Sequence, residues 1–229
     1  MKISAGSFAP HIKNFPVVIG LLALLGFASP SFGGMRWSAR AIDPSLIGAI
    51  SSDSNLLRET LFGVPPKAFT EKLKKNGIVD LSDKQLSDEL EAWAAKRKAD
   101  VGDTEVDLDK AWHGIHYLLT GRAEPNGTLA SKVIMGGENI GPDLGYGPAQ
   151  LLKPDEVKAI AKLLEETTPD TLRKRFEPKE MTRVGIYPDI IWERDGDEAL
   201  RFVLQYYEKL VAFYRLAADR GQAVIFAIS

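Results

Sequence analysis

The chain has 229 residues, of which 45% are apolar and 26% are charged, and its formal net charge is −2. This composition is typical of a globular domain with a core and excludes wholesale disorder. The balanced charge excludes the basic footprint of a nucleic-acid partner, and the absence of cysteine excludes disulfides, thiolate catalysis and cysteine-ligated zinc.

Residues 1–33 have the layout of a secretory signal peptide. Two lysines precede the uncharged run 15–28, and small residues lead up to a cut between Gly33 and Gly34. The run is shorter than the ~20 apolar residues of a transmembrane helix, so we expect no stable membrane insertion after removal of the leader. The protein is then periplasmic or secreted. The alternative is a cytoplasmic protein with a mis-annotated leader, whose true start is Met35.

Short elements open the globular part. The alternating segment 36–41 predicts an edge strand. Asp43 and Pro44 together predict a helix start, with the aspartate as N-cap and the proline in the first helical position. A second helix is predicted over 54–62 and ends at Gly63.

Residues 66–100 form the most polar stretch of the chain. A helix is predicted over 82–98, but the stretch has too few apolar residues for a core of its own. We therefore expect a polar helical arm at about 66–100 on a single domain that spans 34–229.

The segment 108–120 shows the clearest helical pattern. Its apolar residues follow a spacing of three and four and are expected to face the core: Leu108, Ala111, Trp112, Ile115, Leu118 and Leu119. Gly121 is the expected C-cap. A second, polar stripe falls within a sector of about 100° on the opposite face: Asp109, His113, His116, Tyr117 and Thr120.

The carboxyl-terminal half alternates short and long elements. The sequence predicts a short helix over 129–135, a glycine-rich loop over 136–148, helices over 154–165 and 169–176, extended pieces at 184–187 and 190–192, a long amphipathic helix over 198–220 and a buried strand over 223–228. The order does not alternate as βα units do. We therefore predict an α+β fold: a single, mostly helical domain with a small mixed sheet flanked by helices.

Several short segments together resemble one family. They are Asp107–Trp112, Ile115-His116, Leu119–Gly121, Gly137-Glu138, Gly145–Pro148, Ile186–Pro188 and Phe213-Tyr214. From about Met35 to Ser229 the chain resembles the YfbM-like family of uncharacterised bacterial proteins (domain of unknown function family 1877). The resemblance implies an α+β fold with a small sheet flanked by helices, and it implies no activity.

Two of the three histidines, His113 and His116, lie one turn apart on the predicted polar stripe. His116 is the candidate general base or ligand contact, because it lies close to the loop after the helix and the resembling family carries a histidine there. The alternative is a structural histidine that hydrogen-bonds to a loop carbonyl. Zinc needs a third protein ligand, and the remaining histidine, His11, lies in the leader, so we expect no metal site.

The glycine-rich loop lacks both common nucleotide fingerprints, and we expect no cofactor. Glu138 and Tyr146 in this loop are candidates to complete a ligand site with His116, Tyr117 and Thr120. The alternative is a loop that only turns the chain.

Two functions remain open. The first is a non-enzymatic binding protein for a protein partner or a small polar ligand. The alternative is a hydrolase-like acid–base enzyme that uses His116 with a nearby carboxylate, Glu138 or Asp109. The enzyme requires a solvent-accessible pocket in which His116 meets an acid within hydrogen-bonding distance.

Overall fold

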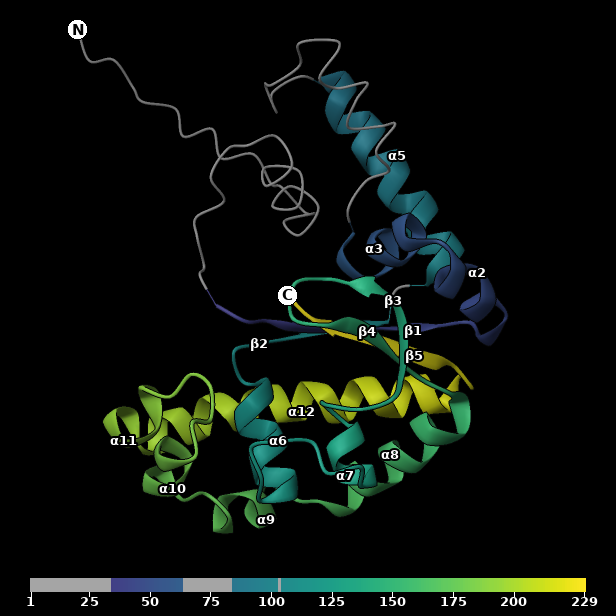
Figure 1. Ribbon diagram of the computed structural model, residues 1–229. Helices are drawn as coiled ribbons and strands as arrows, with labels where there is room; N and C mark the ends of the chain where they lie inside the picture. Colours follow the sequence, from purple (N-terminus) through teal and green to yellow (C-terminus); the bar gives the residue numbers. More distant parts are fainter. Residues whose placement is uncertain (1–33, 64–83, 103) are drawn as a thin grey trace, which may run out of the picture.

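A five-stranded sheet lies between two layers of helices in the computed structural model, which describes residues 34–63, 84–102 and 104–229 (Figure 1). The predicted leader and the first part of the predicted arm lie outside these residues. Across the sheet the strands run in the order β2 (Glu105–Asp109), β1 (Trp37–Ile42), β5 (Ala223–Ile228), β4 (Pro148–Leu152) and β3 (Glu138–Asp143).

Every pairing in this sheet is antiparallel, so the predicted mixed sheet is wrong, whereas the α+β class is confirmed. The β3–β4 hairpin needs only a short turn, and β5 enters between β1 and β4 antiparallel to both. The start of β1 and the end of β5 lie side by side, because the backbone groups of Arg36 and Ser229 exchange two hydrogen bonds of 2.8 Å.

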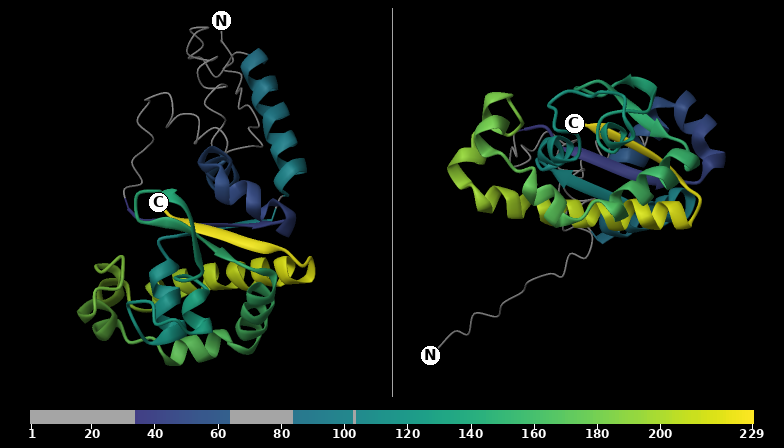
Figure 2. Two further views of the ribbon diagram at one scale, coloured as in Figure 1. Left: turned by 45° about the vertical axis from the view of Figure 1, so that its right-hand side comes forward. Right: turned by 90° about the horizontal axis from the view of Figure 1, so that it is seen from below.

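One layer of helices lies on the upper side of the sheet in Figure 1 and the other on the lower side. The upper layer holds α2 (Ile47–Ser52), α3 (Ser54–Phe62) and α5 (Lys84–Val101), preceded by the 3-10 turn η1 (Pro44–Leu46). The lower layer holds α6 (Trp112–Thr120), α7 (Leu129–Lys132), α8 (Pro154–Glu166), α9 (Pro169–Lys174), α10 (Pro178–Arg183), α11 (Ile191–Asp195) and α12 (Asp197–Asp219). Figure 2 shows α12 running beneath the sheet for much of its width.

The sheet separates two hydrophobic clusters, and β5 contributes to both. Val224 and Phe226 join the large cluster of the lower layer, whereas Ala223, Ile225 and Ala227 join the smaller cluster beneath α2 and α3. Strand side chains alternate between faces, and here both faces are covered. This explains the continuous apolar run and confirms the predicted buried strand.

Several element boundaries predicted from the sequence are confirmed. The Asp43 carboxylate accepts a hydrogen bond of 2.8 Å from the Ser45 N–H, so Asp43 is the N-cap. Gly121 ends α6 with φ 70°, a left-handed conformation that glycine adopts without steric cost. Trp112 and Tyr214 are buried in the core, as their helix positions predict.

Two predictions in the amino-terminal half are wrong. The segment expected as an edge strand is β1, which lies inside the sheet between β2 and β5. The helix expected from Leu108 starts only at Trp112, because Val106 and Leu108 belong to β2. Asp109, with φ 48°, turns the backbone at the end of this strand. Leu108 fits the helical period, since it lies four residues before Trp112, and also the strand period, since it lies two residues after Val106.

Two predictions in the carboxyl-terminal half are also wrong. The glycine-rich segment 136–148 contains β3 rather than only a loop, and β4 follows it directly. The extended piece expected at 190–192 is the start of α11, and α10 precedes the turn at 184–187. Both helices are five or six residues long, too short to display a helical period.

Within the described ranges, each helix is either too short or too polar to cross a lipid bilayer.

Candidate functional site

The two histidines of α6 hold the loop that follows this helix. The His113 Nε2 donates to the Ala123 carbonyl at 2.9 Å, and the His116 Nε2 donates to the neighbouring Glu124 carbonyl at 3.3 Å. The His113 Nδ1 accepts a hydrogen bond of 2.9 Å from the Tyr187 N–H. Since carbonyl oxygens only accept, both imidazoles carry their proton on Nε2.

Burial keeps both imidazoles neutral. Burial lowers the pKa of His116 to about 4, against the opposing hydrogen bond to Glu124, and the charge of His113 lowers it further. Burial also lowers the pKa of His113. The His116 side chain is 0% exposed, and its Nδ1 has no hydrogen-bond partner in the part of the chain that the structure describes. This geometry does not provide the solvent-accessible His116–acid pair that the enzyme alternative requires.

The other candidates from the sequence lie in different places. Thr120 Oγ1 donates to the His116 carbonyl at 2.8 Å, so it closes the helix end. Glu138, at the start of β3, pairs with Lys153 at 3.1 Å. Tyr146 lies in the β3–β4 turn and is 58% exposed. No contact among the described residues joins Glu138 or Tyr146 to His116, and their role in ligand binding stays a prediction.

Asp109 is not on the helix face that carries the histidines. It ends β2, and its carboxylate lies 3.7 Å from the Arg36 guanidinium. Its backbone N–H is bound by the Asp107 carboxylate at 2.7 Å, which supports the left-handed conformation at this position.

Tyr117 points to a different region from its histidine neighbours. The residue is only 6% exposed, and its hydroxyl, which makes no hydrogen bond within the described ranges, is not among the buried unpartnered atoms and therefore reaches solvent. Burial raises the pKa of this hydroxyl; the charges of Glu177 and Glu180 raise it further, and Arg183 lowers it. The three ionised groups that act on Tyr117 therefore come from α10 and the residue just before it.

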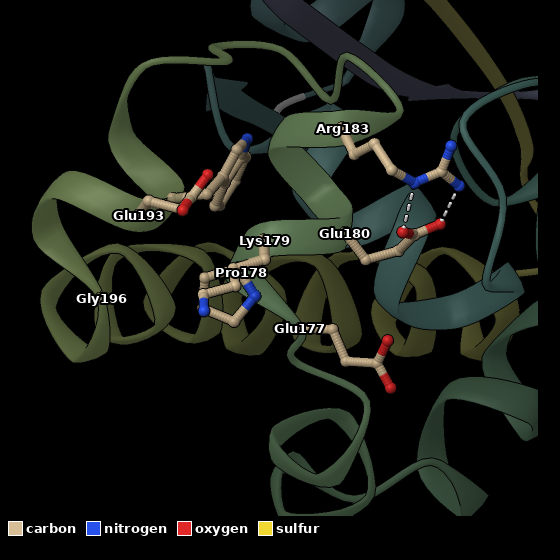
Figure 3. Close-up of a pocket in the computed structure, with 8 residues that line it drawn as sticks. Glu177, Pro178, Lys179, Glu180, Arg183, Glu193 and Gly196 are labelled. Carbon is tan, nitrogen blue, oxygen red and sulfur yellow. Dashed lines mark hydrogen bonds and ion pairs between the residues drawn. The ribbon is translucent and has the colours of Figure 1, made fainter.

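These three residues line a surface pocket between α10 and α11, with a volume of about 610 Å³ (Figure 3). Its wall is formed by Glu177, Pro178, Lys179, Glu180, Arg183, Trp192, Glu193 and Gly196. Ligand pockets in proteins commonly have volumes of roughly 300–1,000 Å³. The pocket is thus large enough for a small molecule.

The buried Trp192 fixes the wall of the pocket. Its indole N–H donates to the Ile186 carbonyl at 2.6 Å, and its ring packs edge-on against Phe176 with centroids 6.5 Å apart. Gly114 on α6 makes room for the ring, because a Cβ there would lie 2.6 Å from an indole carbon. The indole is therefore held from two sides.

The charged groups of the pocket are only partly paired. The Arg183 Nε donates to the Glu180 carboxylate at 2.6 Å, which lowers the pKa of Glu180, and Figure 3 shows this pair across one turn of α10. Glu177, Glu193 and Lys179 are exposed and have no ion-pair partner among the described residues. The pocket thus presents two unpaired carboxylates and one unpaired ammonium group.

This pocket was not predicted from the sequence, although one signal was present. Glu177-Pro178 followed by Glu180 is a helix start of the same type as Lys153-Pro154 followed by Glu156, which predicted the helix over 154–165. The approach of α11 to α10 leaves no trace in the local sequence. Within the described ranges, no group of three or more histidine or acidic side chains is arranged to hold a metal ion.

Comparisons with known proteins agree with the fold. Protein YfbM of Escherichia coli (strain K12) is 27% identical over 160 residues, which cover 68% of this chain and 91% of that protein. The crystal structure of YfbM from Escherichia coli, a protein of unknown function, matches with a TM-score of 0.56 at 19% identity. This structural match covers 86% of this chain and 100% of the YfbM chain. At 19% identity, the match is evidence of a shared fold alone. Because the model of one family matches residues 34–227, the chain belongs to the family described as "Domain of unknown function (DUF1877)" and is a YfbM-like protein.

Proposed function

We propose that this chain is a non-enzymatic binding protein and that it binds a small polar ligand in the pocket between α10 and α11. The observation that carries the proposal is the pocket itself, about 610 Å³ in volume, with the apolar Pro178 beside unpaired charged groups and the fully buried Trp192 supporting the wall from behind. Apolar walls with a few polar groups are typical of small-molecule sites. The walls supply contact area, and the charged groups supply orientation and specificity.

The histidines support binding rather than acid–base catalysis. A general base must reach the proton that it removes, and it needs a pKa near the working pH. His116 is fully buried, has a pKa of about 4, and donates to the Glu124 carbonyl. Both imidazoles instead support the loop after α6. None of the ligand-binding residues predicted from the sequence lines the pocket; Tyr117 is the one whose pKa is shifted by charged residues of its wall, Glu177, Glu180 and Arg183.

The shape of the site favours a small ligand over a protein partner. Protein interfaces of ordinary size bury about 800 Å² on each partner, over a broad patch with a hydrophobic centre. Here the apolar part of the pocket is small and is rimmed by charged side chains. A molecule of a few to a dozen heavy atoms fits such a site better than a protein surface.

A ligand screen with a pocket variant tests the proposal. The purified protein and the Glu177→Gln/Glu193→Gln variant are screened by thermal shift against charged and neutral metabolites, and hits are measured by calorimetry. A ligand at 100 times its Kd stabilises the folded state by about 2.7 kcal/mol, which is readily measured. The control is Glu165→Gln, since Glu165 is an exposed acid on α8, outside the pocket.

We expect hits that stabilise the wild type and the control but not the double variant. If every hit stabilises all three proteins equally, the ligand binds elsewhere and the pocket proposal is wrong. If the screen yields no hit, the proposal of small-ligand binding is wrong as well.

A further inference from the structure

We infer that His113 is a pH-sensitive switch: its neutral imidazole holds the turn 184–190 between α10 and α11, and its protonated imidazole releases that turn. The inference goes beyond the proposed function and does not depend on a ligand. Two hydrogen bonds of opposite polarity carry it, one on each nitrogen of the ring.

The ring of His113 joins two segments that lie far apart in the sequence. Its Nε2 donates to the Ala123 carbonyl at 2.9 Å in the loop 121–128, and its Nδ1 accepts from the Tyr187 N–H at 2.9 Å in the turn 184–190. A carbonyl only accepts and a backbone N–H only donates. Both partners are therefore satisfied only by a neutral imidazole with its proton on Nε2.

Protonation affects the two hydrogen bonds in opposite ways. The second proton must go to Nδ1, because Nε2 already carries one. The N–H groups of Nδ1 and Tyr187 would then face each other without an acceptor between them, so the turn 184–190 has to move away. The hydrogen bond to the Ala123 carbonyl persists and becomes stronger, because its donor is then charged. Acid thus releases the turn and leaves the loop 121–128 in place.

The groups around the ring keep it on the side of α6 and the loop when it is charged. Trp112 stacks on the imidazole with centroids 4.8 Å apart and 5° between the planes, and an aromatic face attracts a cation. The charge of Glu124 on the loop raises the pKa of His113. The ring of His116, 6.4 Å away, has a pKa of about 4 and is neutral in mild acid, and burial keeps the Tyr187 phenol neutral by raising its pKa. The contact that opposes the charged ring is the Tyr187 N–H.

Falling pH favours the released turn. While the turn is bound, burial lowers the pKa of His113, against the hydrogen bond to Ala123 and the charge of Glu124. Once the turn leaves, Nδ1 meets water and the pKa returns toward its ordinary value of 6.5. The released form then binds a proton at a pH at which the bound form does not. The ratio of released to bound molecules therefore rises by up to about ten-fold for each pH unit below 6.5.

The residues beside Tyr187 confine the movement. Its neighbour Ile186 is 0% exposed, and the Ile186 carbonyl accepts a hydrogen bond of 2.6 Å from the Trp192 indole N–H. Tyr187 itself is only partly buried; its ring stacks on Trp112 with centroids 6.1 Å apart, and its hydroxyl leaves no room for a Cβ at Gly34. Release therefore loosens the contacts of Tyr187 with Trp112 and Gly34, whereas Ile186 stays bound.

Amide hydrogen exchange, followed by NMR on the purified full chain near pH 7.5 and near pH 5, tests the switch. The readout is the protection factor of the Tyr187 amide, which corrects for the intrinsic pH dependence of exchange. We expect it to fall several-fold at the lower pH, within the limit of about ten-fold for each pH unit below 6.5. The internal control is the Gly121 amide at the start of the loop 121–128, which is bonded to the Tyr117 carbonyl and should keep its protection factor.

Two variants of His113 fix the switch in its two positions. In His113→Asn the amide oxygen takes the place of Nδ1 as the acceptor for the Tyr187 N–H, and it cannot be protonated in this range. The Tyr187 amide should then stay protected at both pH values. His113→Gln keeps a donor for the Ala123 carbonyl and has no acceptor at the position of Nδ1. Its Tyr187 amide should exchange rapidly at both pH values, so either variant suffices if the other does not fold.

Three results would overturn the inference. The first is a Tyr187 protection factor that is the same at both pH values. The second is an equal loss of protection at Tyr187 and Gly121, which would mean that acid loosens the whole domain rather than the turn 184–190. The third is a pH dependence that persists in His113→Asn or His113→Gln, because the titrating group would then be another residue.

Discussion

Acidification should destabilise this fold through one buried side chain, His116. The ordinary pKa of histidine is 6.5, and in the folded protein burial lowers that of His116 to about 4. Each pKa unit corresponds to about 1.36 kcal/mol, so the difference is worth about 3 kcal/mol. Because the His116 side chain is 0% exposed, solvent does not screen this effect directly. A domain with a stability of about 5–15 kcal/mol would lose a large part of it.

The direction of the effect follows from the protonation of the two states. Above pH 6.5 the imidazole is neutral in both the folded and the unfolded chain, and its contribution to stability is fully present. Between pH 6.5 and about 4 the unfolded chain binds a proton that the folded chain does not bind, so the free energy of unfolding falls as the pH falls. Below pH 4 both states are protonated and this contribution is lost.

Urea denaturation at several pH values between 7.5 and 4, for the wild type and for His116→Gln, measures this term. The glutamine amide nitrogen has about the reach of the histidine Nε2, so it keeps a donor for the Glu124 carbonyl, and it cannot be protonated in this range. Other titrating groups, His113 and the carboxylates, are common to both proteins, so the difference between the two pH profiles isolates His116. We expect the wild type to lose about 3 kcal/mol more than the variant. Parallel profiles would show that His116 is not held neutral by burial.

Three further predictions concern the core and the proposed export of the protein. Trp112→Ala should cost about 3–5 kcal/mol in chemical denaturation, because it empties a buried site, and a loss below about 1 kcal/mol would contradict the assigned packing. Gly114→Ala should cost about 1–3 kcal/mol, because its Cβ would lie 2.6 Å from an indole carbon, whereas Gly48→Ala, with open space around its Cβ, is the control and should not destabilise. For export, amino-terminal sequencing of native protein from an extracytoplasmic fraction should begin at Gly34 or a close neighbour, and a cytoplasmic protein that begins at Met35 would refute it.

The long elements could be predicted from the sequence because their signals are local and repeated. The spacing of apolar residues in α12 continues over 23 residues, and the helix ends in a turn at Gly221, as expected. The run Ala223–Ile228 predicted a buried strand, since only a strand covered on both faces uses apolar residues at every position. The family resemblance, from about Met35 to Ser229, covers nearly the same residues as the match of the family model, 34–227.

Short elements needed the tertiary structure. The segment around Leu108 satisfies a helical and an extended period at once, and only the pairing of β2 with β1 decides between them. Local sequence patterns also could not predict whether neighbouring strands run parallel or antiparallel. That direction depends on where the helices between two strands lead the chain. Two short helices, α10 and α11, fell below the length at which periodicity can be recognised.

The candidate site divides in the same way. The sequence by itself predicted that His113, His116 and Tyr117 fall within one sector of a helix, because three to four residues make one turn. Only the tertiary structure decided that both imidazoles are bonded to a loop, whereas Tyr117 lies near the charges of a pocket. The pocket itself joins residues 177–183 to residues 192–196, and no local pattern records such a contact. The physical reason is that burial, pKa and pairing depend on which segments pack together, and packing is a property of the whole chain.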